Sequence, residues 1–288
     1  MCIRDRVVPA MNVRMWLNKS TQRNVETLKK DGIEFIGPES GEMACGEYGE
    51  GRMTEPGKIV DEIKKYICKQ NFRPLKNQTA IVTAGPTREM IDPVRFISNE
   101  SSGKQGYAIA EMLQHLGAKT TLISGPTSLS APKVTKLINV NTADQMLDAC
   151  EASLPADIAV CAAAVADYKI ANKISSKFKK TGNDQKITLE ENPDILERLS
   201  KRNSLRPKLM IGFAAETENL INNAAEKRKT KGCDWILAND VSEPIGIFGG
   251  ENNLVHLITD KGCEEWPLML KEDVAIRLVE KIVNEIEK

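Results

Sequence analysis

Residues 79–121 read TAIVTAGPTREMIDPVRFISNESSGKQGYAIAEMLQHLGAKTT, and this stretch decides the fold of the chain. Its opening apolar run, residues 80–83, has the length and composition of a buried strand. Residues 107–116 repeat apolar side chains at intervals of three and four, which predicts a helix, and Gly117 supplies a stop signal. Residues 120–123 form the next apolar run. The stretch therefore predicts a strand–helix–strand unit of a parallel α/β protein.

A long polar insert separates this first strand from its helix. In open α/β sheets ligands bind at the carboxyl ends of the strands, so the insert lies where chemistry is expected. Its end, NESSGKQG at residues 99–106, places small residues, hydroxyls and a lysine before a helix, where free N–H groups favour phosphate. The alternative is a capped helix behind a surface loop. A Walker loop is excluded because Gln105 follows Lys104, and a dinucleotide fingerprint would need its glycines directly after the strand.

The composition narrows the class of protein. The 288 residues hold 40 Lys plus Arg against 40 Asp plus Glu, so binding to nucleic acid or to a membrane surface is not favoured. We see no apolar run of membrane-spanning length and no secretory signal. Seven cysteines without a C-x-x-C pair indicate neither a disulfide framework nor a thiolate zinc site, which suits a reducing cytoplasm.

Strands and helices alternate regularly after residues 70–78, a polar, proline-bearing stretch that we take as the linker. Strands are predicted at residues 134–140, 157–161, 210–214, 235–239 and 254–259. Helices are predicted from Thr142, with Gln145 at the spacing of a capping box, and over residues 219–231 and 273–286. Before the linker, helices are predicted over residues 21–30 and 57–69, with a short strand near Phe35.

Two polar residues stand out before the linker. Asn12 ends an apolar strand and could orient a substrate or simply cap a helix. Cys45 lies in the glycine-rich stretch 41–53, which could be a mobile lid or only a connection, and a lone cysteine is commonly inert.

Further candidates follow the linker. Asp167 adds a carboxylate after a strand and a run of small residues, although a solvated aspartate beside tight helix packing is an equal alternative. A lysine cluster could neutralise a triphosphate or form a solvated face; its members are Lys173, Lys177, Lys179 and Lys180. Asn192 with Pro193 reads as an N-cap followed by proline in the first turn of a helix. Lys227 and Lys231 lie one turn apart on a predicted helix, where a solvated basic face is the plain alternative.

Several motifs resemble known enzymes. TAGPTRE, DPVRFISNESSGKQG, AVADY and GFAAETE closely resemble phosphopantothenate–cysteine ligase, the CTP-dependent enzyme of coenzyme A biosynthesis. PAMN and ACGE resemble the last third of the flavin-dependent phosphopantothenoylcysteine decarboxylase, to which the bacterial ligase is often fused. The resemblance implies three parts. Residues 1–69 would be the C-terminal fragment of a flavodoxin-like α/β decarboxylase domain truncated at its N-terminus, 70–78 a linker, and 79–288 a complete ligase domain with a Rossmann-like sheet and helices on both faces.

The resemblance also implies a reaction and its residues. The carboxylate of 4'-phosphopantothenate would attack the α-phosphorus of CTP, and the amine of cysteine would then attack the acyl-cytidylate. Asn99 would serve turnover of this intermediate and Lys177 charge neutralisation. In the decarboxylase fragment Asn12 would contact the substrate carboxylate and Cys45 would donate a proton. The implied CTP-binding residues are Cys161, Ala162, Ala163, Asp167, Lys177, Pro193, Asp194, Ile195, Leu196, Phe213, Lys227 and Lys231.

Cofactors and partners follow from the same resemblance. We expect Mg²⁺ with unidentified ligands and CTP as co-substrate, while FMN belongs to the full-length family and is expected not to be retained here. The implied partners are 4'-phosphopantothenate, cysteine and CTP, with a homodimer through the ligase domain and higher homo-oligomers in full-length members. Two other functions stay open: a working flavin decarboxylase, and a nucleotide-binding scaffold without catalysis.

Overall fold

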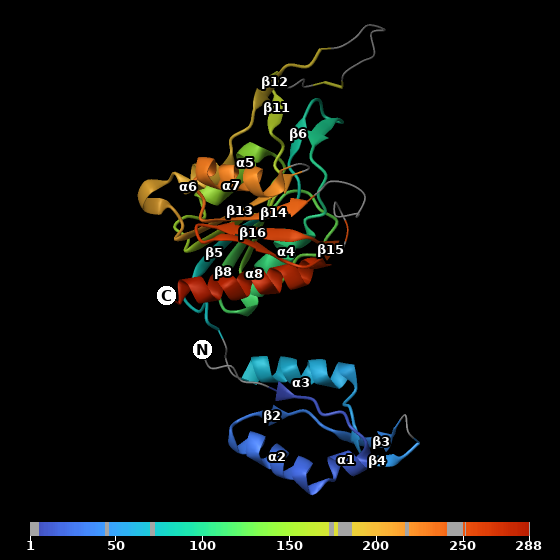
Figure 1. Cartoon of the computed structure of the whole chain (residues 1–288). Coiled ribbons are helices and arrows are strands. Elements are labelled where there is room, and N and C mark those ends of the chain that lie inside the picture. Colours follow the sequence, from blue (N-terminus) through green and yellow to red (C-terminus); the bar gives the residue numbers. More distant parts are fainter. Residues whose placement is uncertain are drawn as a thin grey trace. The chain divides into compact units, whose positions relative to one another are not determined.

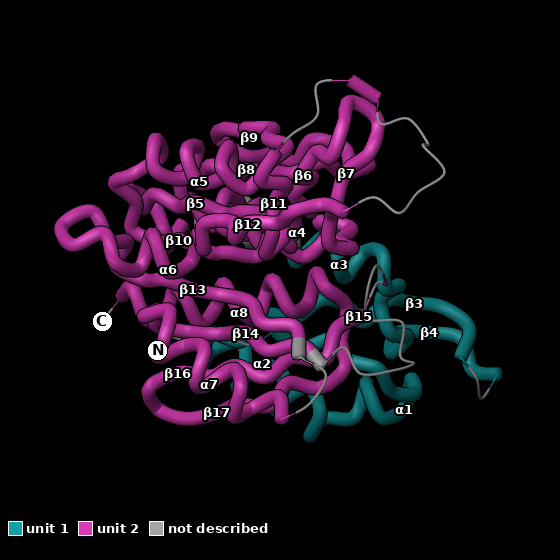
Figure 2. Tube along the Cα trace, turned by 90° about the horizontal axis from the view of Figure 1, so that it is seen from above, with its two compact units in different colours: residues 1–72 teal, residues 73–288 magenta. Residues whose placement is uncertain are grey.

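A computed structural model describes residues 6–43, 46–69, 73–172, 176–177, 186–216, 219–240, 250 and 252–287. The chain forms two compact units, residues 1–72 and residues 73–288 (Figures 1 and 2). The expected linker, residues 70–78, spans the division between them. The units are described separately below, and what each unit is as a domain stays a prediction.

Unit 1 combines short strands with three helices. β1 pairs with β2 in parallel, and β3 pairs with β4 as an antiparallel hairpin. The predicted helices near residues 21–30 and 57–69 are confirmed as α2 and α3, and the strand near Phe35 as β2. The elements of unit 1 are β1 Arg6–Val7, α1 Val13–Trp16, α2 Lys19–Lys30, β2 Glu34–Phe35, β3 Glu39–Glu42, β4 Tyr48–Arg52 and α3 Pro56–Lys69.

Unit 2 is built on an eight-stranded sheet whose order is β17-β16-β14-β13-β10-β5-β8-β9. The predicted strands and helices of this unit are all present. Its elements are β5 Thr79–Ala84, β6 Arg88–Met90, β7 Phe96–Ser98, α4 Lys104–His115, β8 Lys119–Ser124, β9 Lys136–Asn139, α5 Ala143–Glu151, β10 Ile158–Cys161, β11 Tyr168–Ile170, β12 Leu189–Glu191, α6 Ile195–Ser200, the 3-10 helix Asn203–Leu205, β13 Leu209–Glu216, α7 Leu220–Lys231, β14 Trp235–Asp240, β15 Asn252–Asn253, β16 Val255–Thr259, β17 Gly262–Glu265, β18 Met269–Leu270 and α8 Lys271–Ile286.

The parallel part of this sheet is doubly wound. Its six strands β5, β8, β9, β10, β13 and β14 stand in the order 3-2-1-4-5-6 when they are numbered along the chain. The order reverses between β5 and β10, and the crevice at such a reversal is where ligands of these folds bind. β16 and β17 extend the sheet with antiparallel pairs. The predicted α/β class is confirmed.

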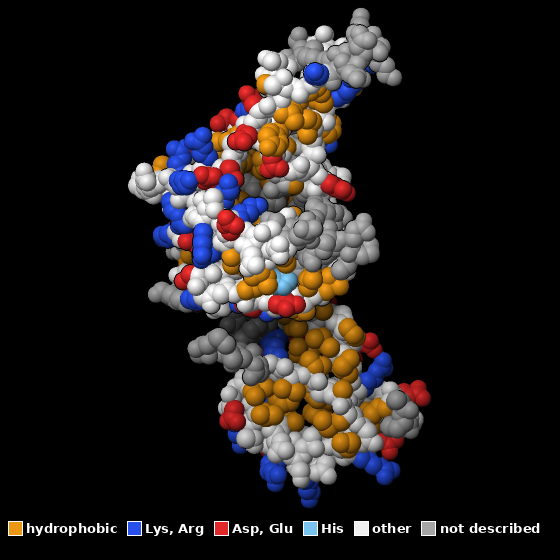
Figure 3. Space-filling view, turned by 45° about the horizontal axis from the view of Figure 1, so that its top comes forward, with side chains coloured by type: hydrophobic (Ala, Val, Ile, Leu, Met, Phe, Trp, Pro, Cys, Tyr) orange, Lys and Arg blue, Asp and Glu red, His pale blue; other side chains and the backbone are white. Residues whose placement is uncertain are grey.

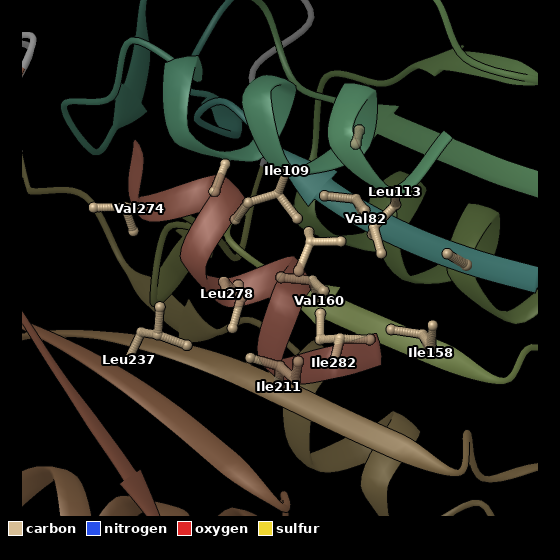
Figure 4. Packing of buried hydrophobic residues seen from close by; sticks show 14 of the residues in the cluster. Val82, Ile109, Leu113, Ile158, Val160, Ile211, Leu237, Val274, Leu278 and Ile282 are labelled. Carbon is tan, nitrogen blue, oxygen red and sulfur yellow. The ribbon is translucent and has the colours of Figure 1, made fainter. Parts of the chain in front are cut away.

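Alternating side chains of the strands bury both faces of the sheet. Val82, Val160 and Ile211 pack with α4 and α8 on one face, as Figure 4 shows. Their sequence neighbours Ile81 and Met210 pack with α5, α6 and α7 on the other face. Successive residues of a strand point to opposite faces, so the continuous apolar runs of the sequence reflect a sheet that is covered by helices on both sides.

Two small hairpins lie outside this sheet. β6 and β7 pair antiparallel within the insert that follows β5, and β11 pairs antiparallel with β12. These strands are three residues long, and the insert was expected only as a polar excursion. Glu89 of β6 is fully buried, and its Oε1 accepts from the Ala143 amide at the start of α5, 2.8 Å away. The insert is thereby joined to the start of α5.

Candidate functional site

A cleft of about 610 Å³ opens at the N-terminus of α4. We call it the α4 cleft. Residues 98–106, residues 162–165 and the ends of β13, β14 and β15 form its walls. Gly103 is the N-cap of α4, with φ 77°, and as a glycine it has no side chain that could cap the helix. The first residues of α4 lie in the lining of the cleft. That arrangement suits an anionic group.

Asn99 lies in the wall of the α4 cleft. Its side chain is exposed, and its Nδ2 donates to the carbonyl of Val165 over 2.9 Å. The bond joins the insert after β5 to the loop after β10. The structure thus brings Asn99 to the predicted carboxyl edge of the sheet, and its chemical role stays a prediction.

The loop after β10 separates two clefts. Its backbone is fixed by the loop after β5: the Ala164 amide donates to Gly85 O at 2.9 Å, and the Ala166 amide donates to the hydroxyl of Thr87, also at 2.9 Å. Asp167 follows and is exposed. Ala162 lines the α4 cleft, whereas Cys161 lines the second cleft.

The second cleft, about 1020 Å³, lies between the loop after β10, the start of α6 and the helix α7. We call it the α6–α7 cleft. It collects most of the residues that the resemblance implied for nucleotide binding: Cys161, Ala163, Asp167, Pro193, Asp194, Ile195, Leu196, Phe213, Lys227 and Lys231. Ala163, Asp167, Phe213 and Lys227 line both clefts. The two clefts therefore share a wall.

The start of α6 differs from the prediction at its cap. Asp194, not Asn192, is the N-cap, and its Oδ1 accepts from the Glu197 amide at 2.8 Å. Asn192 instead donates from Nδ2 to Ala166 O at 2.8 Å, which links the start of α6 to the loop after β10. Asp194 supplies the capping oxygen, so α6 begins at Ile195 and Pro193 lies before the N-cap, outside the helix.

Three of the cations that line the α6–α7 cleft, Lys201, Arg202 and Lys231, are paired with carboxylates of the protein. Lys231 Nζ lies 3.0 Å from Asp194 Oδ2 and 3.1 Å from Glu197 Oε2. The hydrogen bond to Asp194 raises the pKa of Lys231, and bonds from Lys201 and then Lys231 lower the pKa of Glu197. Arg202 pairs with Glu151 in the same cleft. Figure 3 shows basic and acidic side chains interspersed over the α6 and α7 side of unit 2.

Some predicted residues are not brought to either cleft. Lys177 is exposed and is absent from the described linings of both clefts. Lys173, Lys179, Lys180 and Cys45 lie outside the described residues. Cys161 is present at the cleft, but burial raises the pKa of its thiol well above the ordinary value, so it is a poor nucleophile.

The predicted stretch 99–106, which includes Gln105, lines the α4 cleft, but sequence reasoning missed Asn239 and Asn253 as components of it. Asn239 is the penultimate residue of β14 and Asn253 ends β15, and each has a buried side-chain oxygen without a hydrogen-bond partner in the described structure. A signal was present for Asn239, because it is a polar side chain at the carboxyl end of a predicted strand. Asn253 carried no such signal.

In unit 1, Asn12 is the N-cap of α1, and its Oδ1 accepts from the Met15 amide at 2.9 Å. The capping alternative is therefore confirmed. Its Nδ2 also donates to Glu47 Oε2 at 3.1 Å, and Glu47 directly precedes β4. Asn12 is thus joined to the glycine-rich hairpin.

The described part of the chain has neither a metal-binding cluster nor a membrane-spanning helix. No set of three or more His, Cys, Asp and Glu side chains is placed there to hold a metal ion. None of the described helices is long and apolar enough to cross a membrane.

Comparison with known proteins identifies the family. Residues 75–286 match the model of the DNA/pantothenate metabolism flavoprotein C-terminal domain, and residues 4–68 match that of the flavoproteins. The chain is 41% identical over 283 residues to the coenzyme A biosynthesis bifunctional protein CoaBC of Haemophilus influenzae, and this alignment covers 98% of the chain and 70% of the relative. The CoaBC protein of Escherichia coli K12 is 42% identical over 286 residues, with the same shares covered.

A solved structure agrees with this. The crystal structure of the C-terminal domain of a CoaBC protein has a TM-score of 0.62 and 37% identity, and covers 75% of this chain and 98% of that one. The DNA/pantothenate metabolism flavoprotein from Streptococcus pneumoniae, at 23% identity and a TM-score of 0.61, supports the fold alone.

These matches correct the assignment of residues 79–288 to a complete CTP-dependent ligase. The family model that matches this region is described as a flavoprotein C-terminal domain, the model that matches residues 4–68 is also a flavoprotein, and neither description refers to ligation or CTP. The names of these relatives refer to coenzyme A biosynthesis and not to ligation. They do not support the expected Mg²⁺ either. The motifs did predict the correct metabolic pathway, coenzyme A biosynthesis. The chain belongs to the family of pantothenate-metabolism flavoproteins that includes the CoaBC bifunctional proteins, and it is an enzyme of coenzyme A biosynthesis.

Proposed function

We propose that unit 2 binds a phosphorylated pantothenate-derived substrate, 4'-phosphopantothenate or its cysteine conjugate, with the phosphate at the N-terminus of α4. The observation that carries the proposal is the uncapped start of α4 in the wall of the α4 cleft. Amides of the first turn and the helix dipole attract a phosphate group there. The lining also holds Lys104, Lys227 and Lys271, which outnumber its carboxylates Glu100 and Asp167. Asn99 would contact the acyl part of the substrate, since it lines the cleft beside Val165.

Calorimetry with 4'-phosphopantothenate and with pantothenate tests this proposal. The phosphorylated compound should bind at least about tenfold more tightly, because one phosphate at a helix N-terminus gains several charge-assisted hydrogen bonds. Ser102→Asp places a carboxylate in the cleft wall and should remove most of that preference. Ser204→Asp is the matched control, since Ser204 lies exposed in the 3-10 helix. Equal binding of the two compounds by the unaltered protein would contradict the proposal.

A second candidate function, contribution to a decarboxylation step, is favoured by the contact between Asn12 and the β3–β4 hairpin. In this proposal Asn12 orients the substrate carboxylate and Cys45, which lies between β3 and β4 in the sequence, donates a proton. The amide of Asn12 is held at a fixed place by Met15 N and Glu47 Oε2, as an orienting group requires.

FMN is the cofactor that the flavoprotein family implies. Asn12 Nδ2 donates to the carboxylate of Glu47, and Arg14 is paired with the same carboxylate. This ion pair offsets the charge of Glu47, so a substrate carboxylate can approach Asn12, whereas these described residues offer no unpaired cation for the phosphate of FMN.

Release of CO2 from phosphopantothenoylcysteine, with FMN added in excess, tests this second proposal. Asn12→Asp keeps the cap of α1 but repels a substrate carboxylate, and should lower the rate at least tenfold. Asn18→Asp is the matched control, because Asn18 caps α2 in the same way. Absence of CO2 release by the unaltered chain, or equal rates of the two variants, would rule out this role. The homodimer through unit 2 stays a prediction.

A further inference from the structure

Asn253 is a buried amide in the wall of the α4 cleft. Its side chain is 1% exposed, and it lies on β15, which pairs with β18. Its Nδ2 donates to Gln105 Oε1 at 3.4 Å, and its Oδ1 has no hydrogen-bond partner in the described structure. A buried acceptor without a donor is costly, so it calls for an explanation.

The orientation of this amide follows from its neighbours. Gln105, the second residue of α4, donates from Nε2 to Lys271 O at 3.1 Å. A carbonyl oxygen can only accept, so the Gln105 side chain must turn its nitrogen to Lys271 and its oxygen to Asn253. Asn253 must then present its nitrogen to Gln105. The free group of Asn253 is therefore its oxygen, an acceptor.

Asn239 adds a second acceptor to the same cleft, since its Oδ1 is also buried without a partner. The charged side chains of the lining are Lys104, Lys227 and Lys271 together with the carboxylates Glu100 and Asp167. The lysines outnumber the carboxylates, so a neutral donor suits the two asparagine oxygens better than a cationic one. A neutral donor is a hydroxyl or an amide N–H.

We propose that Asn253, together with Asn239, is a specificity-determining residue that accepts a hydrogen bond from a hydroxyl or amide N–H on the acyl chain of the ligand whose phosphate binds at α4. This inference rests on the proposed function of unit 2. It assigns the two parts of the α4 cleft different tasks. Amides of the helix bind the phosphate, which many metabolites carry, and the asparagine oxygens select the chain attached to it. A site built to pair a ligand donor rejects a ligand without that donor strongly.

Calorimetry of Asn253→Leu with 4'-phosphopantothenate and with inorganic phosphate tests the inference. Leucine matches asparagine in size but cannot accept. We expect binding of 4'-phosphopantothenate to weaken at least about tenfold while binding of phosphate stays within about twofold. Asn252→Leu is the matched control, because Asn252 is the exposed neighbour on β15 and does not line the cleft. Gln105→Leu removes the bond to Asn253 Nδ2 but keeps the acceptor, and should weaken binding less than Asn253→Leu.

The outcomes separate the two proposals. Equal weakening of both ligands, or equal losses in Gln105→Leu and Asn253→Leu, would overturn the role of Asn253 and leave only a structural one. No change in Asn253→Leu would overturn it as well. If the unaltered protein does not prefer 4'-phosphopantothenate over pantothenate, the proposed function itself fails, whatever the variants show.

Discussion

The α4 cleft and the α6–α7 cleft of unit 2 share a wall but differ in how their charged and polar groups are paired. In the α6–α7 cleft, Lys231 is paired with Asp194 and Glu197, and Arg202 with Glu151, while Asn192 has one buried oxygen without a partner in the described structure. In the α4 cleft, oxygens of Asn239 and Asn253 have no partner in the described structure, and α4 has no side-chain cap. A ligand of the α6–α7 cleft must compete with ion pairs within the protein. A ligand of the α4 cleft can supply the hydrogen-bond donors that the two asparagine oxygens lack.

The clefts also differ in how firmly their walls are held. A Cβ on Gly106 of α4 would lie 2.6 Å from Ala84 Cβ and 3.0 Å from Thr83 O, so the helix rests directly on β5. A Cβ on Gly212 of β13 would lie 2.5 Å from Leu196 Cδ2, the end of a flexible side chain in the α6–α7 cleft. At Gly106 the wall of the α4 cleft packs against β5 atoms that cannot move aside. At Gly212 the wall of the α6–α7 cleft packs against a leucine side chain that can change rotamer.

The largest effect that we predict separates these two glycines. Gly106→Ala should lower the free energy of unfolding by about 1–3 kcal/mol, because neither Ala84 nor the backbone of β5 can move aside. Gly212→Ala should lower it by less than about 1 kcal/mol, because Leu196 can change rotamer. Urea unfolding of both variants measures the difference. Similar losses would show that the walls of the two clefts are equally stiff.

A smaller effect is predicted at the N-cap of α6, which also pairs with Lys231. Asp194→Asn keeps a capping oxygen and removes the charge, whereas Asp194→Ala removes both. Alanine should lower the free energy of unfolding by about 1 kcal/mol more than asparagine, the usual contribution of an N-cap. Chemical denaturation of the two variants tests this. Equal stabilities would mean that Asp194 acts through its charge alone.

The smallest predicted effect concerns pH. Because bonds from Lys201 and Lys231 lower the pKa of Glu197 from its ordinary value of 4.5, its stabilisation is present above that value and is lost as the pH falls through the lowered one. Glu197→Gln should therefore cost about 0.5 kcal/mol near pH 7, and the difference should disappear in acid. Glu226→Gln, an exposed position on α7, is the control. A loss that persists in acid would exclude the ion-pair origin.

Most of the fold of unit 2 could be predicted from its sequence, because the spacing of apolar residues along a short segment indicates which of them are buried in a strand or a helix. The capping box of Thr142 and Gln145 at the start of α5 was predicted from spacing alone and is present. The β6–β7 and β11–β12 hairpins could not be predicted, since each strand has only three residues and no apolar run. The N-cap of α6 was misplaced because Asn192 and Asp194 are both good capping residues, and tertiary contacts decide between them.

The site was predictable only where strand ends indicated it. Cys161, Asp167 and Phe213 follow or lie in recognisable strands, and the doubly wound order brings them together. Asn253 lies 148 residues from its hydrogen-bond partner Gln105, so no local pattern could join them. The motif resemblance led to the right pathway, but it assigned a reaction that the family descriptions do not carry.

The aspartate before β10 has a consequence for how the chain is synthesised and folded. Asp157 Oδ2 accepts from both the amide and the hydroxyl of Thr79 at 2.8 Å, across 78 residues of chain. β5 pairs with β8 and β10, and only β8 lies near it in sequence. Closing the longer loop costs more entropy, and such non-local pairing slows folding. A nascent chain must therefore extend past Cys161 before its central strand acquires a second neighbour, and until then one edge of β5 stays unpaired.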